Sequence, residues 1–146
     1  MVAGLGDMGF SLALSALGSG FGVSYAGLAS VGAWKKAYQN NKAAPFLLVA
    51  FIGAPLSQTV YGFILRNQIK AANLPPETYP YQMLIGALAG LAIGFSALVQ
   101  GKIGAKAADA LAETGKGFGN YLMALGIAET VAIFVLVFSM TTLPKM

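Results

Sequence analysis

The chain has 146 residues, of which 57% are hydrophobic and 10% are charged, and its mean hydropathy is +0.70. This composition excludes an ordinary soluble domain of that length and predicts an integral membrane protein. The chain contains no cysteine and no histidine, which excludes disulfide frameworks, thiolate catalysis and Cys/His zinc sites. The net charge of +4 comes mainly from lysines between apolar segments, so it does not indicate binding to nucleic acid.

Four apolar segments are long enough to cross about 30 Å of hydrocarbon as helices. They lie at about 8–33, 46–65, 83–99 and 118–140. No Lys or Arg precedes Lys35, so the first segment is interpreted as a transmembrane helix of the mature protein rather than a signal peptide. We therefore predict an all-α membrane protein, in which residues 1–146 form a single membrane domain of two helical hairpins, at about 8–65 and 83–141.

The distribution of basic residues predicts the orientation of these helices. The connections 34–45 and 102–117 together contain Lys35, Lys36, Lys42, Lys102, Lys106 and Lys116, whereas Arg66, Lys70 and Lys145 belong to the opposite side. Because basic residues in short loops favour the cytoplasm, both connections are predicted to be cytoplasmic and both termini to be outside.

The first and third segments are rich in small residues at every fourth position. The series are Gly18, Gly22, Ala26 and Ser30 in the first segment, and Gly86, Gly90 and Gly94 in the third. Such a series leaves a flat ridge on a helix, along which a second helix can approach closely. The second and fourth segments have no such series.

The two hairpins are predicted to be a tandem repeat. The segment SQTVYGF (57–63) aligns with AETVAIF (128–134), which places Gln58 opposite Glu129, and GVS (22–24) aligns with GFS (94–96) at nearly the same spacing. Because both hairpins begin on the same side, the repeats are parallel, unlike the inverted repeats of many transporters. The second hairpin alone carries a carboxylate at this position.

Glu129 lies near the middle of the fourth apolar segment, within YLMALGIAETVAIFVLVF (121–138). A charge at the centre of a membrane helix costs roughly 2.5 to 3.5 kcal/mol, so it must be protonated, paired or coordinated. A functional carboxylate is therefore the leading interpretation. The alternative is a permanently protonated carboxyl that hydrogen-bonds a neighbouring helix.

Hairpin symmetry predicts which polar residues lie at the depth of Glu129, because residues equidistant from a turn have similar heights. Gln100 and Glu129 are equidistant from the turn in ALAETGKGF (110–118), and Gln58 and Leu28 are equidistant from Ala43. We therefore expect Gln58, Gln100 and Glu129 to converge from three helices. This geometry requires the third helix to continue past its apolar segment toward Leu111.

Ser57 and Tyr61 accompany Gln58 on the second helix. Carboxylate, amide and hydroxyl oxygens suit a hard cation, and one negative charge matches a monovalent ion. Either amide alone could instead serve as a link between helices. Pro55 predicts a kink one turn before Gln58, which either frees nearby carbonyls for an ion or is a bend required by packing.

Three segments carry a resemblance to a known family: APLSQTVYGF (54–63), FSALVQGK (95–102) and AETVAIF (128–134). They resemble the 16-kDa-type proteolipid, the K or c ring subunit, of bacterial sodium-translocating V-type ATPases. The resemblance implies a ring of identical subunits in the lipid bilayer, with the first and third helices inside. It also implies a stator subunit with an essential arginine, central stalk subunits, and ATP hydrolysis in separate soluble subunits. The chain is then expected to carry no catalytic residue of its own.

The resemblance to sodium-translocating members also implies the site residues. They are Glu129, Gln58, Gln100, Ser57 and the main-chain carbonyl of Ala54 as ligands of Na⁺, with Tyr61 hydrogen-bonded to the glutamate. The close sodium-pumping relatives have threonine where this chain has Ser57. Two alternatives stay open, a ring of the same family that carries H⁺ and a small four-helix secondary transporter. A structural proteolipid would not need three polar groups at one depth.

Overall fold

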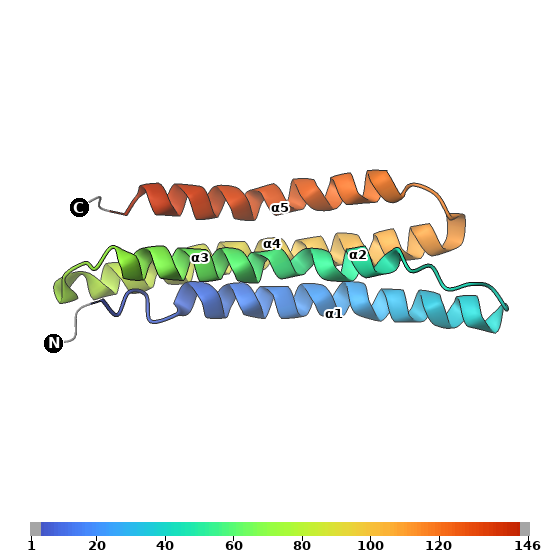
Figure 1. Ribbon diagram of the computed structural model, residues 1–146, viewed down its shortest axis with the longest axis horizontal. Helices are drawn as coiled ribbons and strands as arrows, with labels where there is room; N and C mark the ends of the chain where they lie inside the picture. Colours follow the sequence, from blue (N-terminus) through green and yellow to red (C-terminus); the bar gives the residue numbers. More distant parts are fainter. Residues whose placement is uncertain (1–3, 144–146) are drawn as a thin grey trace.

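A computed structural model describes residues 4–143, and every regular element in that range is helical. The elements are α1 (Phe10–Gln39), α2 (Leu48–Gly53), η1 (Ala54–Leu56), α3 (Ser57–Ala71), η2 (Pro76–Thr78), α4 (Tyr79–Thr114) and α5 (Phe118–Thr141). Figure 1 shows them as long rods that run alongside one another, with α2, η1 and α3 joined into one rod. The start of α1 and the end of α5 lie at the same end of the bundle, here named the terminal end, and the connections 40–47 and 115–117 lie at the other, the connection end.

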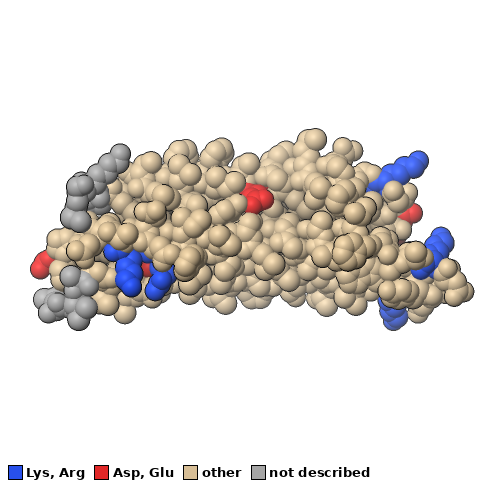
Figure 2. Space-filling model, in the orientation of Figure 1, with Lys and Arg blue, Asp and Glu red and all other residues tan. Residues whose placement is uncertain are grey.

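Four helical spans are long and apolar enough to cross a membrane: Phe10–Gln39, Leu48–Ala71, Pro76–Thr114 and Phe118–Thr141. This confirms the predicted all-α membrane fold of two tandem hairpins. Figure 2 shows lysine and arginine atoms near both ends of one face and almost no charge between them. That distribution is typical of helices whose central parts contact lipid. Which end faces the cytoplasm stays a prediction.

The turn between α4 and α5 forms where hairpin symmetry requires it. α4 continues to Thr114, which confirms that the third helix extends past its apolar segment. Gly115 and Gly117 then adopt left-handed φ values of 67° and 87°, which glycine tolerates without a steric penalty. The N–H of Gly115 donates to the carbonyl of Leu111 at 2.8 Å and so ends α4.

The small-residue series of α1 and α4 face each other and are buried. A Cβ atom added to Gly18 would overlap the backbone of Gly94, and one added to Gly101 would overlap the backbone of Gly22. The two helices therefore touch through main-chain atoms. This confirms the close approach that the glycine spacing predicts, which in a membrane relies on dispersion contacts between well-fitted surfaces.

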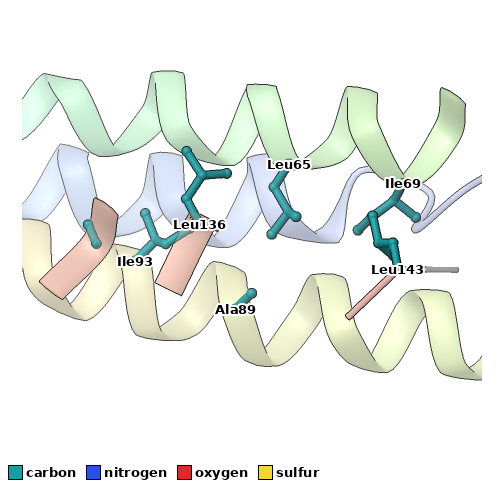
Figure 3. Packing of buried hydrophobic residues seen from close by; sticks show 7 residues of the cluster. Leu65, Ile69, Ala89, Ile93, Leu136 and Leu143 are labelled. Atoms are coloured by element: carbon teal, nitrogen blue, oxygen red, sulfur yellow. The ribbon is translucent and has the colours of Figure 1, made fainter. Parts of the chain in front are cut away.

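Two apolar clusters fill the bundle on either side of its middle. The cluster toward the terminal end consists of Leu65, Ile69, Ala89, Ile93, Ala132, Leu136 and Leu143. Figure 3 shows its labelled members extending toward one another from α3, α4, α5 and the segment that follows α5. The cluster toward the connection end consists of Leu48, Phe51, Ala107, Ala108, Leu111 and Leu125. The ring of Phe51 packs against Phe118 and Tyr121, with centroids 5.6 and 6.2 Å apart. A polar layer that contains Ser57, Gln58, Tyr61, Gln100 and Glu129 lies between the two clusters.

Pro55 interrupts the second span just before that polar layer. The α-helix changes to a 3₁₀ helix over Ala54–Leu56, and Pro55 itself is buried against α1. The interruption follows from the missing N–H of proline and from the clash of its ring with the carbonyl four residues earlier. The predicted irregularity one turn before Gln58 is therefore present.

Candidate ion site

The centre of the polar layer is a hydrogen bond between two buried amides. Gln58 of α3 donates from Nε2 to Oε1 of Gln100 in α4, at 2.8 Å. The two side chains are 0% and 1% exposed. The prediction that these residues lie at one depth is confirmed. A direct bond across α3 and α4 at this point also satisfies two amides that would be costly to bury alone.

Further hydrogen bonds extend from both sides of the amide pair to side-chain and main-chain oxygens. Ser57 places its hydroxyl oxygen 3.2 Å from Oε1 of Gln58 and 3.1 Å from the carbonyl oxygen of Ala54. At the other end, Gln100 donates from Nε2 to the carbonyl oxygen of Leu125 in α5, at 3.0 Å. The resulting chain of hydrogen bonds crosses three helices at one level.

Glu129 is held by the phenol of Tyr61. The hydroxyl of Tyr61 donates to Oε1 of Glu129 at 2.6 Å, a length typical of a charge-assisted bond. Tyr61 is three residues after Gln58 and therefore shares its helix face, so α3 contributes to both parts of the site. Glu129 is half-buried. The carboxylate therefore lies at the edge of the bundle.

Two contributors were not predicted from the sequence. The hydroxyl of Ser96 donates to the carbonyl of Ala128 at 2.7 Å, beside Glu129, and the carbonyl of Leu125 accepts from Gln100. The internal repeat contains a signal for the second, because the alignment that pairs Gln58 with Glu129 also pairs Ala54 with Leu125. Both carbonyls lie one helical turn before the paired residue. Ser96 lies one turn before Gln100 on α4, within the quoted segment FSALVQGK.

The polar layer offers one carboxylate and several neutral oxygens as possible donors to a cation. These donors are Glu129, the amide oxygens of Gln58 and Gln100, the hydroxyl of Ser57 and the carbonyls of Ala54 and Leu125. Oxygen ligands of this kind fit a hard cation, and a single carboxylate balances one positive charge. Within residues 4–143 there is no group of three or more His, Cys, Asp or Glu side chains that could hold a metal.

Residues 83–142 match the family model for the C subunit of ATP synthase. The second hairpin is similar to that protein. The matched segment includes α5 and most of α4, and with them Gln100 and Glu129. A comparison with curated protein sequences found no match.

Proteins of the matched family form homo-oligomeric rings in the membrane. The first hairpin, with Ser57, Gln58 and Tyr61, precedes the matched segment, and the internal repeat relates it to the second hairpin. The polar layer thus combines residues of a hairpin that matches the family model with residues of the preceding hairpin, which contributes Ser57, Gln58 and Tyr61.

Proposed function

We propose that the chain is the rotor ring subunit of a sodium-translocating V-type ATPase and carries one Na⁺ at Glu129. The observation that carries the proposal is the polar layer itself. Two buried amides are hydrogen-bonded to each other between two apolar clusters, and a half-buried carboxylate is bonded to Tyr61, which lies one turn from Gln58 on the same helix face. In this proposal identical subunits form the ring, which works with a stator subunit that has an essential arginine and with central stalk subunits.

The neutral oxygens favour sodium over a proton. A proton needs only the carboxyl group, whereas Na⁺ must replace most of its water shell with protein oxygens. The amide oxygens of Gln58 and Gln100 and the carbonyl of Ala54 are suited to that role. The hydroxyl of Tyr61 would then stabilise the ionised Glu129 without itself coordinating the ion.

The two apolar clusters favour a lateral route for the ion. Leu65, Ile93 and Leu136 fill the bundle on the terminal side of the polar layer, and Phe51 and Leu111 fill it on the connection side. An ion that moved along the bundle axis would have to cross one of them. The half-buried position of Glu129 instead directs exchange to the surface of the bundle, where a stator subunit would act.

The absence of a carboxylate from the first repeat favours a pump of the V type. Gln58 stands where the second hairpin has Glu129, so four helices carry one ion. For a fixed number of ATP molecules per rotation, fewer ions leave more free energy for each. Each charge moved against the membrane potential requires roughly 2.3 kcal/mol per 100 mV, so this arrangement supports transport against a steep gradient.

The test is labelling of the purified ring with a carbodiimide, which modifies a protonated carboxyl in an apolar setting. The labelling of Glu129 is measured across pH in Na⁺ and in matched K⁺. We expect Na⁺ to protect Glu129, with less protection at low pH because protons and Na⁺ compete for one carboxylate. Labelling that falls with rising pH but ignores Na⁺ would make this a proton ring, and absence of labelling at Glu129 would contradict the assignment of the carboxylate.

A further inference from the structure

The Gln58 amide has hydrogen-bonding capacity that the site does not use. A glutamine side chain has two N–H donors and an oxygen with two lone pairs. Nε2 of Gln58 donates to Gln100, and Oε1 lies 3.2 Å from the hydroxyl of Ser57. Among residues 4–143 the second N–H has no acceptor, although the side chain is fully buried. A buried donor of this kind requires a partner.

Among the described residues, Ser19 in α1 has a buried hydroxyl oxygen that lacks a hydrogen-bond donor, whereas Gln58 has a buried N–H that lacks an acceptor. Its side chain is 2% exposed, and its hydroxyl oxygen has no hydrogen-bond partner in the part of the chain that the structure describes. A serine hydroxyl has one O–H donor and two acceptor lone pairs. The oxygen of Ser19 is therefore an available acceptor in the interior of the bundle.

The packing of α1 against α3 places Ser19 opposite Gln58. The two helices are antiparallel, and their facing residues are identified by the glycines: a Cβ on Gly62 would meet Ser15, and a Cβ on Gly22 would meet Pro55 at 2.7 Å. Ser19 follows Ser15 by one helical turn, and Gln58 precedes Gly62 by one turn. Moving one turn along each helix from the Ser15–Gly62 contact leads to Ser19 on α1 and to Gln58 on α3.

We propose that Ser19 is a positioning residue of the ion site, whose hydroxyl oxygen accepts the second N–H of Gln58 when a cation is bound. An amide can present either its oxygen or its nitrogen to a cation, and only the oxygen is a ligand. A hydrogen bond from Nε2 to Ser19, together with the bond from Nε2 to Gln100, fixes the orientation in which Oε1 faces the cation. This inference rests on the proposed cation site and adds a contribution from α1, the helix that provides none of the ligands.

The test is the Na⁺ concentration that gives half-protection of Glu129 from carbodiimide in the intact ring. Ser19→Ala should raise it about fivefold, because one stabilising hydrogen bond to a ligand is lost. Ser19→Cys, which keeps a weak acceptor of similar size, should give a smaller increase. The ratio of the half-protecting Li⁺ and Na⁺ concentrations should also change, because the orientation of the amide affects the size of the ligand cavity. A purely structural role of Ser19 would leave this ratio unchanged.

Ser11→Ala and Ser30→Ala are the matched controls. Both serines are in α1, both are fully buried, and both hydroxyl oxygens lack a partner among the described residues, but they lie about two and three turns from Ser19. We expect neither to shift the half-protecting concentration. An unchanged value in Ser19→Ala, or an equal shift in the controls, would overturn the role of Ser19 while leaving the cation site intact. Absence of Na⁺ protection in the unmodified ring would instead overturn the cation site, and this inference with it.

Discussion

The contact between α1 and α4 differs in kind from the contact between α3 and α5. α1 and α4 meet through main-chain atoms at Gly18, Gly22, Gly94 and Gly101, where no side chain intervenes. α3 and α5 meet through side chains, which include the hydrogen bond from Tyr61 to Glu129. The first contact has no rotamers to change, whereas the second can rearrange without moving the helices.

The α1–α4 contact is therefore the rigid part of the bundle, and the α3–α5 contact is the part where side chains can rearrange. A close main-chain contact keeps α1 and α4 at a fixed distance and register, because any added atom overlaps the facing backbone. A carboxylate held by one phenol can be released when a single side chain rotates. In a rotating subunit the rigid pair would preserve the shape of the ring while the other pair binds and releases its ion. Three substitutions test this division.

The largest effect is expected for Glu129→Gln. This change preserves the shape of the side chain and removes its charge, so ATP-driven Na⁺ uptake in reconstituted vesicles should fall more than about a hundredfold. The ring should still assemble, since the α1–α4 contact is unchanged. Glu113→Gln is the control, because Glu113 is largely exposed and pairs with Lys36 near the connection end. Retained uptake in Glu129→Gln would contradict the assignment of the ion site.

A smaller effect, on stability rather than transport, is expected for Gly18→Ala. The new methyl group would overlap the backbone of Gly94, so the fold should lose about 1–3 kcal/mol. The measurement is the temperature at which the detergent-solubilised ring dissociates. Gly20→Ala, two residues further along the same helix, meets nothing within 4 Å and should leave this temperature unchanged or higher. Equal stability of the two variants would argue against main-chain contact between α1 and α4.

The smallest of the three effects is expected for Gln100→Leu. It removes the acceptor for Gln58 and the donor to the Leu125 carbonyl, so we expect about tenfold weaker protection of Glu129 by Na⁺. Gln82→Leu is the control, because Gln82 is equally buried in α4 but donates to Thr78 near the start of the helix, at 2.8 Å. A similar loss of protection in both variants would mean that Gln100 affects packing rather than the ion.

The sequence predicted the depth of the polar layer because depth is a position along the helix axis, which depends only on spacing along the chain. Hairpin symmetry needs only the position of a turn and the rise of a helix, and the turn at Gly115 and Gly117 is marked by its glycines. The hydrogen bond between Gln58 and Gln100 confirms that the two amides lie at one level. The count was wrong for α1, where Ser19 rather than Leu28 lies opposite Gln58, because the connection 40–47 is not helical and shifts the register of α1 against α3. The contact of α1 with α4 was predictable for a similar reason, since a glycine at every fourth position defines one helix face.

The partners of each polar side chain required the tertiary structure. Hairpin symmetry predicts that Gln100 and Glu129 face each other, but Gln100 donates to the Leu125 carbonyl one turn away, while Glu129 accepts from Tyr61. Residues at one depth can point in different directions, because the rotation of each helix about its axis is set by the neighbours it packs against.

The placement of Ser19 shows the same limit. Nothing in the sequence distinguishes it from Ser11, Ser15 or Ser30, which recur along the same apolar segment. Its position opposite Gln58 depends on how Gly62 and Pro55 of the second span pack against α1. The sequence by itself determined the helices, the level of the carboxylate and the flat glycine face, all of which depend on spacing along the chain. The tertiary structure decided which oxygen meets which nitrogen, because that depends on the distance and rotation between helices.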